Sequence, residues 1–171
     1  MEYLKNIEVV FARTNEDGVE EFADPGSPAE RFDPGALESL WLWAAPTDSS
    51  LPANLGRAPD VMRFPGPGGS QFGIVCLPPH SAGKRRFDRS HTEDPNMRAG
   101  NHTEPSMHAT DTLDYDVILS GKVDLELGSG EVRTLGPGTC VILGGVAHAW
   151  KNHYDEPCIL AAAMIGTGRT E

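Results

Sequence analysis

The sequence predicts an all-β protein built as an antiparallel sandwich or barrel. In the second half of the chain, apolar runs of strand length recur about every 8–12 residues, each closed by glycine or another turn-forming residue. In one run, Val123, Leu125 and Leu127 alternate with Asp124 and Glu126, the pattern of a strand with one buried face. Composition agrees, because 19 glycines and 14 prolines in 171 residues favour turns over long helices.

Residues 1–60 are expected to form an irregular N-terminal arm. They hold 12 acidic and 4 basic residues, and turn-forming segments separate short apolar pieces. We expect one or two strands and a short helix beginning at Pro34, since proline is favoured in the first turn of a helix. In an extended chain Trp41 and Trp43 would share one face. They would then pack the arm onto the core or a second subunit, or form an aromatic wall of a ligand pocket.

Residues 61–171 are expected to form the barrel. Its first strand begins near Ser70, after a turn rich in glycine and proline, and is ended by Pro78 and Pro79. Further strands are expected within 113–121, 122–130, 131–138, 139–145, 147–153 and 158–166. No alternation of helices and strands and no phosphate-binding glycine loop is found in the sequence.

A long polar loop, 81–107, separates the first barrel strand from the others. It carries the basic cluster Lys84, Arg85, Arg86 and Arg89. Loops of this length in compact domains are typically binding loops, lids or disordered segments. The loop is therefore either solvated surface or a lid that attracts an anionic substrate, in which case Arg86 would contact that substrate.

The charge of the chain excludes several classes of function. A net charge of −11 leaves no basic excess to neutralise nucleic-acid phosphates or an anionic membrane. No apolar run approaches the ~18 residues of a membrane span, and the N-terminus lacks the pattern of a signal peptide. Cys76, Cys140 and Cys158 have no close spacing and are expected as buried, reduced thiols. We therefore expect a cytoplasmic protein.

Two histidines and a carboxylate form a candidate metal site. His108 precedes a predicted strand that contains Asp114 and Asp116, and His148 ends another predicted strand. Residues two apart share a face of a strand, so these side chains would converge if the two segments are neighbouring strands of one barrel. Two imidazoles and one carboxylate suit catalytic Fe(II), Mn or Zn. On spacing alone, the alternative is that the histidines only end strands.

The segments around these residues resemble the two sequence motifs of the cupins. The first cupin motif is G(X)5HXH(X)3–4E(X)6G, and His108, Asp114 and Gly121 match its first His, its Glu and its last Gly. The second motif is G(X)5PXG(X)2H(X)3N. It is matched by Gly138, Gly145, His148 and Asn152, with one residue fewer after the first Gly and Leu143 in place of Pro.

The resemblance implies a cupin-type jelly-roll β-barrel holding a divalent metal ion, Zn, Fe, Mn or Ni, at His108, Asp114 and His148. The chain departs from the motif because Thr110 occupies the second His position and Asp114 replaces Glu. Such a site has two imidazoles and one carboxylate, and a returning histidine could complete it: His80, His91 or His102.

The resemblance implies an enzyme acting on a small, polyketide-like or oxygenated carbonyl compound. The sequence is similar to those of small single-domain cupins of bacterial and fungal small-molecule metabolism. Lyase or dehydratase, cyclase and isomerase chemistry is expected, with Asp116 or His102 moving the proton. The alternatives are an Fe(II) dioxygenase and a non-catalytic cupin that binds a small ligand. Thr110, Trp150 and Asn152 are expected to contact substrate, and the chain is expected to form a homodimer with no nucleic-acid or membrane partner.

Overall fold

The structure, a computed structural model, describes residues 2–84, 94–99 and 104–169, and within them the chain forms thirteen strands in three antiparallel sheets. The strands are β1 (Phe11–Thr14), β2 (Glu20–Ala23), β3 (Ala29–Asp33), β4 (Leu37–Ala45), β5 (Ser70–Leu77), β6 (Met97–Ala99), β7 (His108–Thr110), β8 (Thr112–Ser120), β9 (Val123–Leu127), β10 (Val132–Leu135), β11 (Cys140–Gly144), β12 (His148–Lys151) and β13 (Cys158–Gly166). The described residues contain no helix, so the all-β prediction is confirmed.

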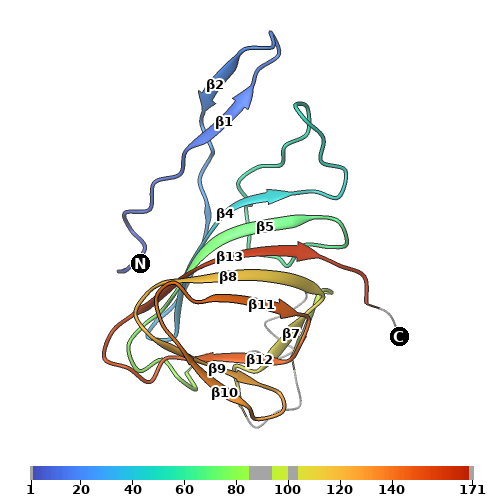
Figure 1. Cartoon of the computed structure of the whole chain (residues 1–171). Coiled ribbons are helices and arrows are strands. Elements are labelled where there is room, and N and C mark those ends of the chain that lie inside the picture. The colour runs from blue at the N-terminus through green and yellow to red at the C-terminus, as the bar shows by residue number, and fades with distance from the viewer. Residues whose placement is uncertain (1, 85–93, 100–103, 170–171) are drawn as a thin grey trace.

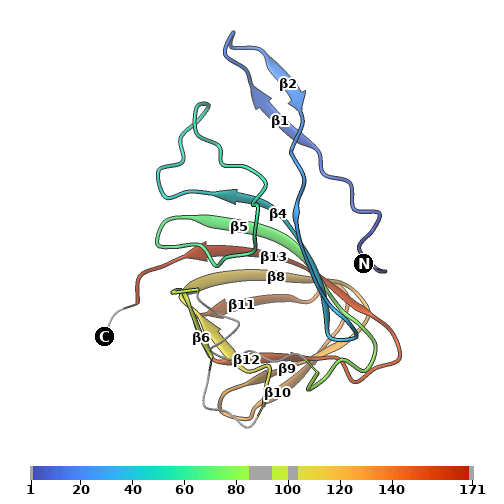
Figure 2. The ribbon, with the colours of Figure 1, turned by 180° about the vertical axis from the view of Figure 1, so that it is seen from behind.

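Two of the sheets face each other and form the barrel (Figures 1 and 2). One sheet has six strands in the order β11-β8-β13-β5-β4-β3, and the other has five in the order β10-β9-β12-β7-β6. Along β8 the inward residues Thr112, Asp114, Asp116 and Ile118 are buried, whereas the outward Tyr115 is 44% exposed. This alternation places the polar residues of β8 inside the barrel.

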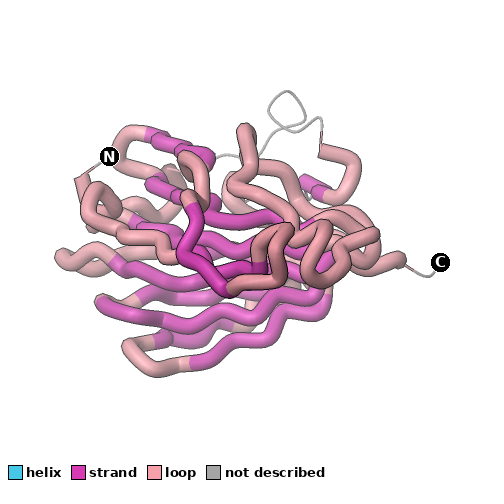
Figure 3. Tube along the Cα trace, turned by 90° about the horizontal axis from the view of Figure 1, so that it is seen from above, coloured by secondary structure: helices cyan, strands magenta, loops and turns pink. Residues whose placement is uncertain are grey.

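The six-stranded sheet draws β3 and β4 from the first 60 residues. The remaining strands of that segment, β1 and β2, pair only with each other and project from the barrel as a hairpin (Figures 1 and 2). Seen from above, the described chain consists of strands and loops (Figure 3). The expected short helix at Pro34 is wrong. Pro34 and Gly35 lie in the tight turn between β3 and β4, where the Ala36 amide donates to the Asp33 carbonyl and Gly35 has a φ of 69°. A left-handed residue reverses the chain there, so no helix can continue.

Trp41 and Trp43 face opposite sides of β4, which corrects the expectation of a shared face. Trp41 pairs with Gly73 and Trp43 with Phe72, so a bulge inserts one extra residue into β4 between the two pairs. Trp41 packs in the barrel core. Trp43 instead lies against Phe11 of the projecting hairpin, with ring centroids 4.4 Å apart, and its Nε1 donates to the Leu55 carbonyl. Each tryptophan thus fulfils one of the two alternatives derived from the sequence.

The N-terminal segment covers the outer face of β4 and β5 through a buried carboxylate. Both oxygens of Glu38, which is 1% exposed, accept hydrogen bonds from the backbone amides of Glu2, Tyr3 and Leu4. Leu4 then packs in a second apolar cluster, outside the barrel, together with Leu40, Leu42, Ile74 and Cys76. Consequently, β4 is buried on both faces.

A Glu38→Gln variant should lose stability. The amide nitrogen that replaces one carboxylate oxygen cannot accept a hydrogen bond from the backbone N–H groups, so one donor is left unpaired. We expect a loss of about 1–3 kcal/mol in the free energy of unfolding. Urea unfolding measures this loss, and the amides of Tyr3 and Leu4 should also exchange faster with solvent. Glu30→Gln on β3, where the glutamate is exposed, is the matched control. Equal stability of the two variants would contradict the role of Glu38.

The structure also bears on the expected burial of the cysteines, on the long loop and on membrane-spanning helices. Cys76 and Cys158 are buried free thiols as expected, but Cys140 is exposed, because it points outward from β11. Within the long loop, residues 81–84, 94–99 and 104–107 are described, and Met97–Ala99 forms β6. Arg85, Arg86 and Arg89 lie outside the described residues. No helix long and apolar enough to cross a membrane occurs in the part of the chain that the structure describes.

Candidate metal centre and binding pocket

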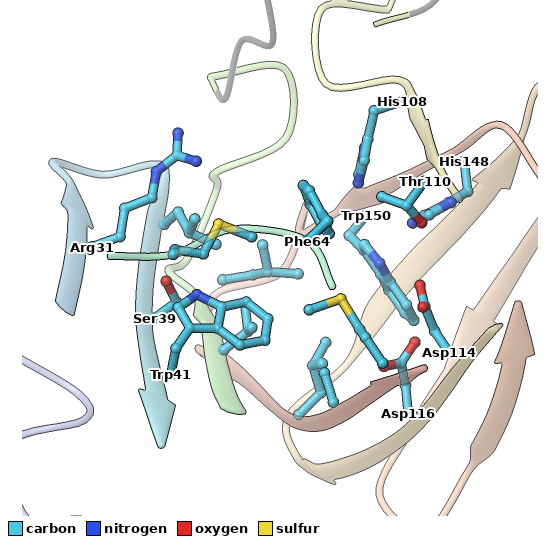
Figure 4. A pocket seen from close by; sticks show the side chains of 17 residues that line it. Arg31, Ser39, Trp41, Phe64, His108, Thr110, Asp114, Asp116, His148 and Trp150 are labelled. Carbon is cyan, nitrogen blue, oxygen red and sulfur yellow. The ribbon is translucent and has the colours of Figure 1, made fainter. Parts of the chain in front are cut away.

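A pocket lies inside the barrel between the two sheets (Figure 4). Both sheets contribute to its lining: Arg31, Leu37, Ser39, Trp41, Met62, Phe64, Val75, Leu77, His108, Thr110, Asp114, Asp116, His148, Trp150, Leu160, Ala162 and Met164. Its volume is about 60 Å³. This space would hold a few water molecules or a compact ligand of similar size.

His108 and His148 lie side by side in this pocket. They are directly opposed in the pairing of β7 with β12, both are buried, and their ring centroids are 4.5 Å apart. In each ring Nδ1 lies 3.0 Å from a backbone carbonyl two residues earlier, that of Ser106 or Val146. A carbonyl can only accept, so Nδ1 carries the proton and Nε2 of the neutral ring has the lone pair. This arrangement of a donated Nδ1–H is typical of metal-binding histidines.

Two carboxylates of β8 form another wall of the pocket. Asp114 and Asp116 are 6% and 5% exposed, and Oδ1 of Asp114 has no hydrogen-bond partner among the described residues. Burial and the neighbouring charge of Asp114 raise the pKa of Asp116 to about 7. Burial also raises the pKa of Asp114, although a hydrogen bond from Thr112 lowers it. Asp116 can therefore hold or release a proton near neutral pH.

Of the other predicted site residues that the structure describes, Thr110 and Trp150 line the pocket and Asn152 does not. Thr110 lines the pocket, and its hydroxyl lies 2.6 Å from that of Thr112. Trp150 also lines it, with its ring edge-on to His148 at a centroid distance of 6.3 Å. Asn152 lies outside the pocket lining, since its amide holds a turn through Leu77, Tyr154 and Glu156.

The remaining histidines do not join the pair within the described structure. His80 has an exposed side chain 3.0 Å from Asp155, and His153 is exposed. His91 and His102 fall outside the described residues, as does Arg86, so their expected roles in the site lie beyond what the structure describes.

Arg31 and Ser39 are pocket residues that the sequence interpretation missed. Ser39 lies within the run Leu37–Leu42, in which every residue is buried, so no alternation of polar and apolar residues marks its inward face. The signal that identifies both residues is the register of β3 with β4, where Arg31 pairs with Ser39. This register can be assigned only after the turn at Pro34 is recognised.

Ion pairs and hydrogen bonds of charged side chains connect the strand ends around the pocket. Asp111, between β7 and β8, binds Arg98 of β6 and Arg169 near the C-terminus, and these bonds lower the pKa of Asp111. Arg169 also donates to the carbonyls of Thr110 and Gly145. Arg169 therefore holds the segment that follows Thr110 to the loop that leads into His148.

The donors of the pocket fit a divalent transition-metal ion. Two imidazoles, each with Nδ1 facing a backbone carbonyl, share the pocket with Asp114, a buried carboxylate that has an unpartnered oxygen. Within the described residues, no three His, Cys, Asp or Glu side chains lie together as a group ready to hold an ion. The structure thus supplies a preset pair of nitrogen ligands, and the carboxylate would have to complete the set.

Comparison with known proteins agrees with this fold. The Schizosaccharomyces pombe Cnp3 cupin domain superimposes with a TM-score of 0.50 at 12% identity, covering 92% of this chain and 86% of that domain. A Cupin 2 conserved barrel protein of Salinispora arenicola gives a TM-score of 0.44 at 16% identity, covering 80% and 81%. The chain therefore has a cupin-type fold, as the resemblance predicted.

Sequence relatives are similar only in part. Phomopsin biosynthesis cluster protein C' of Diaporthe leptostromiformis is 45% identical over 49 residues, which are 29% of this chain and 26% of that protein. The cupin-domain-containing oxidoreductase srdB of Neurospora crassa is 41% identical over 51 residues, 30% and 26% of the two chains. The match thus spans about a quarter of the length of these curated relatives. No protein-family model matches the chain.

Proposed function

We propose that the chain is a metal-dependent cupin enzyme that acts on a small oxygenated carbonyl compound by proton transfer, as a lyase or dehydratase, a cyclase or an isomerase. The observation that carries this proposal is the buried pair His108 and His148, opposed across two strands with both Nδ1 atoms bound to carbonyls. Such rings present Nε2 to an ion without having to reorient.

Different pocket residues would bind the metal ion, transfer the proton and exclude water. His108, His148 and Asp114 would hold the ion, which when bound supplies a Lewis acid that polarises a carbonyl oxygen. Asp116, whose pKa burial raises to about 7, takes or gives a proton at its carboxyl oxygen. Trp150 and Met164 line the space beside these groups and exclude water, which strengthens the electrostatic interactions within.

The partial relatives support a role in small-molecule biosynthesis. Two phomopsin biosynthesis cluster proteins and an oryzines biosynthesis cluster protein of Aspergillus oryzae match 29% of the chain at 45%, 45% and 37% identity. A tailoring reaction on a small compound is in keeping with these partial matches.

A second candidate function is an Fe(II) dioxygenase. The partial likeness to the oxidoreductase srdB favours it, and two histidines with one carboxylate are the ligands of many non-haem iron oxygenases. The two candidates differ in the metal that they require, because proton-transfer chemistry needs no redox-active ion.

Elemental analysis of protein purified without added metal tests both candidates. We expect near-stoichiometric divalent metal, and retention of Zn, Mn or Ni would support proton-transfer chemistry, whereas retention of Fe alone would support the dioxygenase. A chain that takes up none of these ions, even after incubation with each in turn, would contradict both candidates. That result would leave the cupin as a metal-free ligand binder.

A further inference from the structure

One end of the pocket carries polar groups that the proposed chemistry does not use. Arg31 of β3 and Ser39 of β4 are directly opposed in register, and Trp41 follows two residues later on the same inner face. Figure 4 shows Ser39 and Trp41 beside each other, with the Arg31 guanidinium turned away from them and the histidines and carboxylates at the other end of the pocket. We call Arg31, Ser39 and Trp41 the β3–β4 end.

Two polar atoms at the β3–β4 end are buried and unpaired. Ser39 is 1% exposed and Trp41 is 4% exposed, and neither the Ser39 hydroxyl nor the Trp41 Nε1–H has a hydrogen-bond partner among the described residues. Burying a hydroxyl or an indole N–H without a partner costs free energy, so native proteins rarely keep such groups without a use. The indole can only donate, and therefore the missing partner is an acceptor.

The direction of the Trp41 indole is fixed by its packing against Gly73. A Cβ atom at Gly73 would lie 2.5 Å from the Trp41 ring and 2.7 Å from the Leu40 carbonyl, so only glycine leaves room for the ring. The N–H of Trp41 is therefore a preorganised donor, which favours binding because little side-chain freedom is lost.

The charges in the pocket determine which end of an anionic ligand would lie at the β3–β4 end. The Arg31 guanidinium lies at the β3–β4 end, where it is ion-paired with Asp33 at 2.8 Å. Asp114 and Asp116 occupy the opposite end, and Asp116 is separated from Trp41 by three strand spacings, about 14 Å along the sheet. A carboxylate would be repelled by the aspartates and attracted to the donors.

We propose that the β3–β4 end binds the carboxylate of a small carboxylic acid. The Ser39 hydroxyl and the Trp41 N–H donate to the carboxylate oxygens, and the apolar part of the ligand lies over Val75 and Leu160. This inference rests on the proposed function and narrows its substrate class to small acids whose carbon chain points toward His108 and His148.

Titration of 15N-labelled, metal-free protein with butanoate tests the inference by NMR. The chain has three tryptophans, so it gives three indole N–H signals, which Trp→Phe variants assign. The Trp41 signal should move downfield as the carboxylate accepts its proton. The Trp43 signal should not move, because that N–H already donates to Leu55 at 2.8 Å. The Trp150 signal, at the histidine end, should not move either. The neutral analogue butanamide should bind about tenfold more weakly, because hydrogen bonds to a charged acceptor are the stronger ones.

Ser39→Ala gives a second, independent readout. It should raise the Kd for butanoate about tenfold, as expected for a lost hydrogen bond to a charged group. It should also raise the melting temperature of the free protein, because a buried unpaired hydroxyl is removed. Ser81→Ala is the matched control, since Ser81 is 4% exposed, has an equally unpartnered hydroxyl and does not line the pocket. It should stabilise the protein and leave the Kd unchanged.

Three results would overturn the inference: a Trp41 signal that does not move, a Trp41 signal that butanamide moves with equal affinity, or movement of the Trp150 signal alone. Failure of this test is distinguishable from failure of the proposed function. Protein that loads metal but does not bind butanoate at Trp41 retains the proposed function and loses the acid site. Protein that binds butanoate at Trp41 but loads no metal retains the acid site and loses the proposed function.

Discussion

In a His148→Ala variant, we expect the bound metal to fall from near-stoichiometric to almost none. The described structure provides two imidazoles as a preset pair, and removal of one leaves His108 and a single carboxylate. Two protein ligands rarely retain a divalent ion against dialysis. Elemental analysis of wild type and variant, purified side by side, measures the effect. The binding of metal should also weaken as pH falls through about 6.5, where protons compete for the imidazoles.

His153→Ala is the matched control for this experiment. His153 follows the same strand but is exposed, so its removal should leave the metal content unchanged. The far-UV circular dichroism of both variants should match that of wild type. Equal metal content in wild type and His148→Ala would refute the site and the reaction class proposed from it.

An Asp116→Asn variant should remove a large part of the pH dependence of stability in metal-free protein. The pKa of Asp116 rises from the usual 3.8 to about 7 in the folded chain, mainly through burial. The folded state therefore holds a proton that the unfolded state releases. Its stabilising contribution is complete below pH 3.8, and it is lost as pH rises through 7. Three pKa units correspond to about 4 kcal/mol, so wild type should lose up to that amount between these limits.

Urea unfolding at pH 4, 6 and 8 with a chelator present measures this difference. At pH 8 the asparagine variant should be the more stable protein, whereas at pH 4 the two should be similar, since Asp116 is then protonated in the folded chain. Asp48→Asn, at an exposed aspartate, should leave the profile of wild type unchanged. Parallel profiles of wild type and Asp116→Asn would show that burial does not hold the proton on Asp116.

The sequence predicted the barrel strands because most of them have one buried face. β8 and β13 alternate buried and less buried residues along their length, and this alternation is visible in the sequence of β8 around Asp114 and Asp116. The convergence of His108 and His148 also followed from their motif positions. Their separation and their tautomers did not, because both depend on the opposed pairing of β7 and β12 and on carbonyls of the local backbone.

The acid-binding end of the pocket could not be predicted in the same way. β4 is covered by the barrel core on one face and by the N-terminal segment on the other, so its sequence shows no alternation. Ser39 therefore gives no signal that distinguishes it from Glu38 and Leu40, which point the other way, and Trp41 could be expected at a pocket only together with Trp43. The anchoring of the N-terminal segment by Glu38 is a contact between distant parts of the chain, which local patterns do not encode.

The single-residue bulge in β4 has a consequence for the comparison of homologous chains. Because it separates Trp41 from Trp43, one indole lines the cavity and the other packs on the hairpin, although the letters Trp-Leu-Trp suggest equivalence. In a homologue that lacks the bulge, the same three letters would direct both indoles inward and alter the shape of the ligand space. Conservation of this tripeptide in an alignment is therefore not evidence of a shared specificity, and the strand register must be compared first.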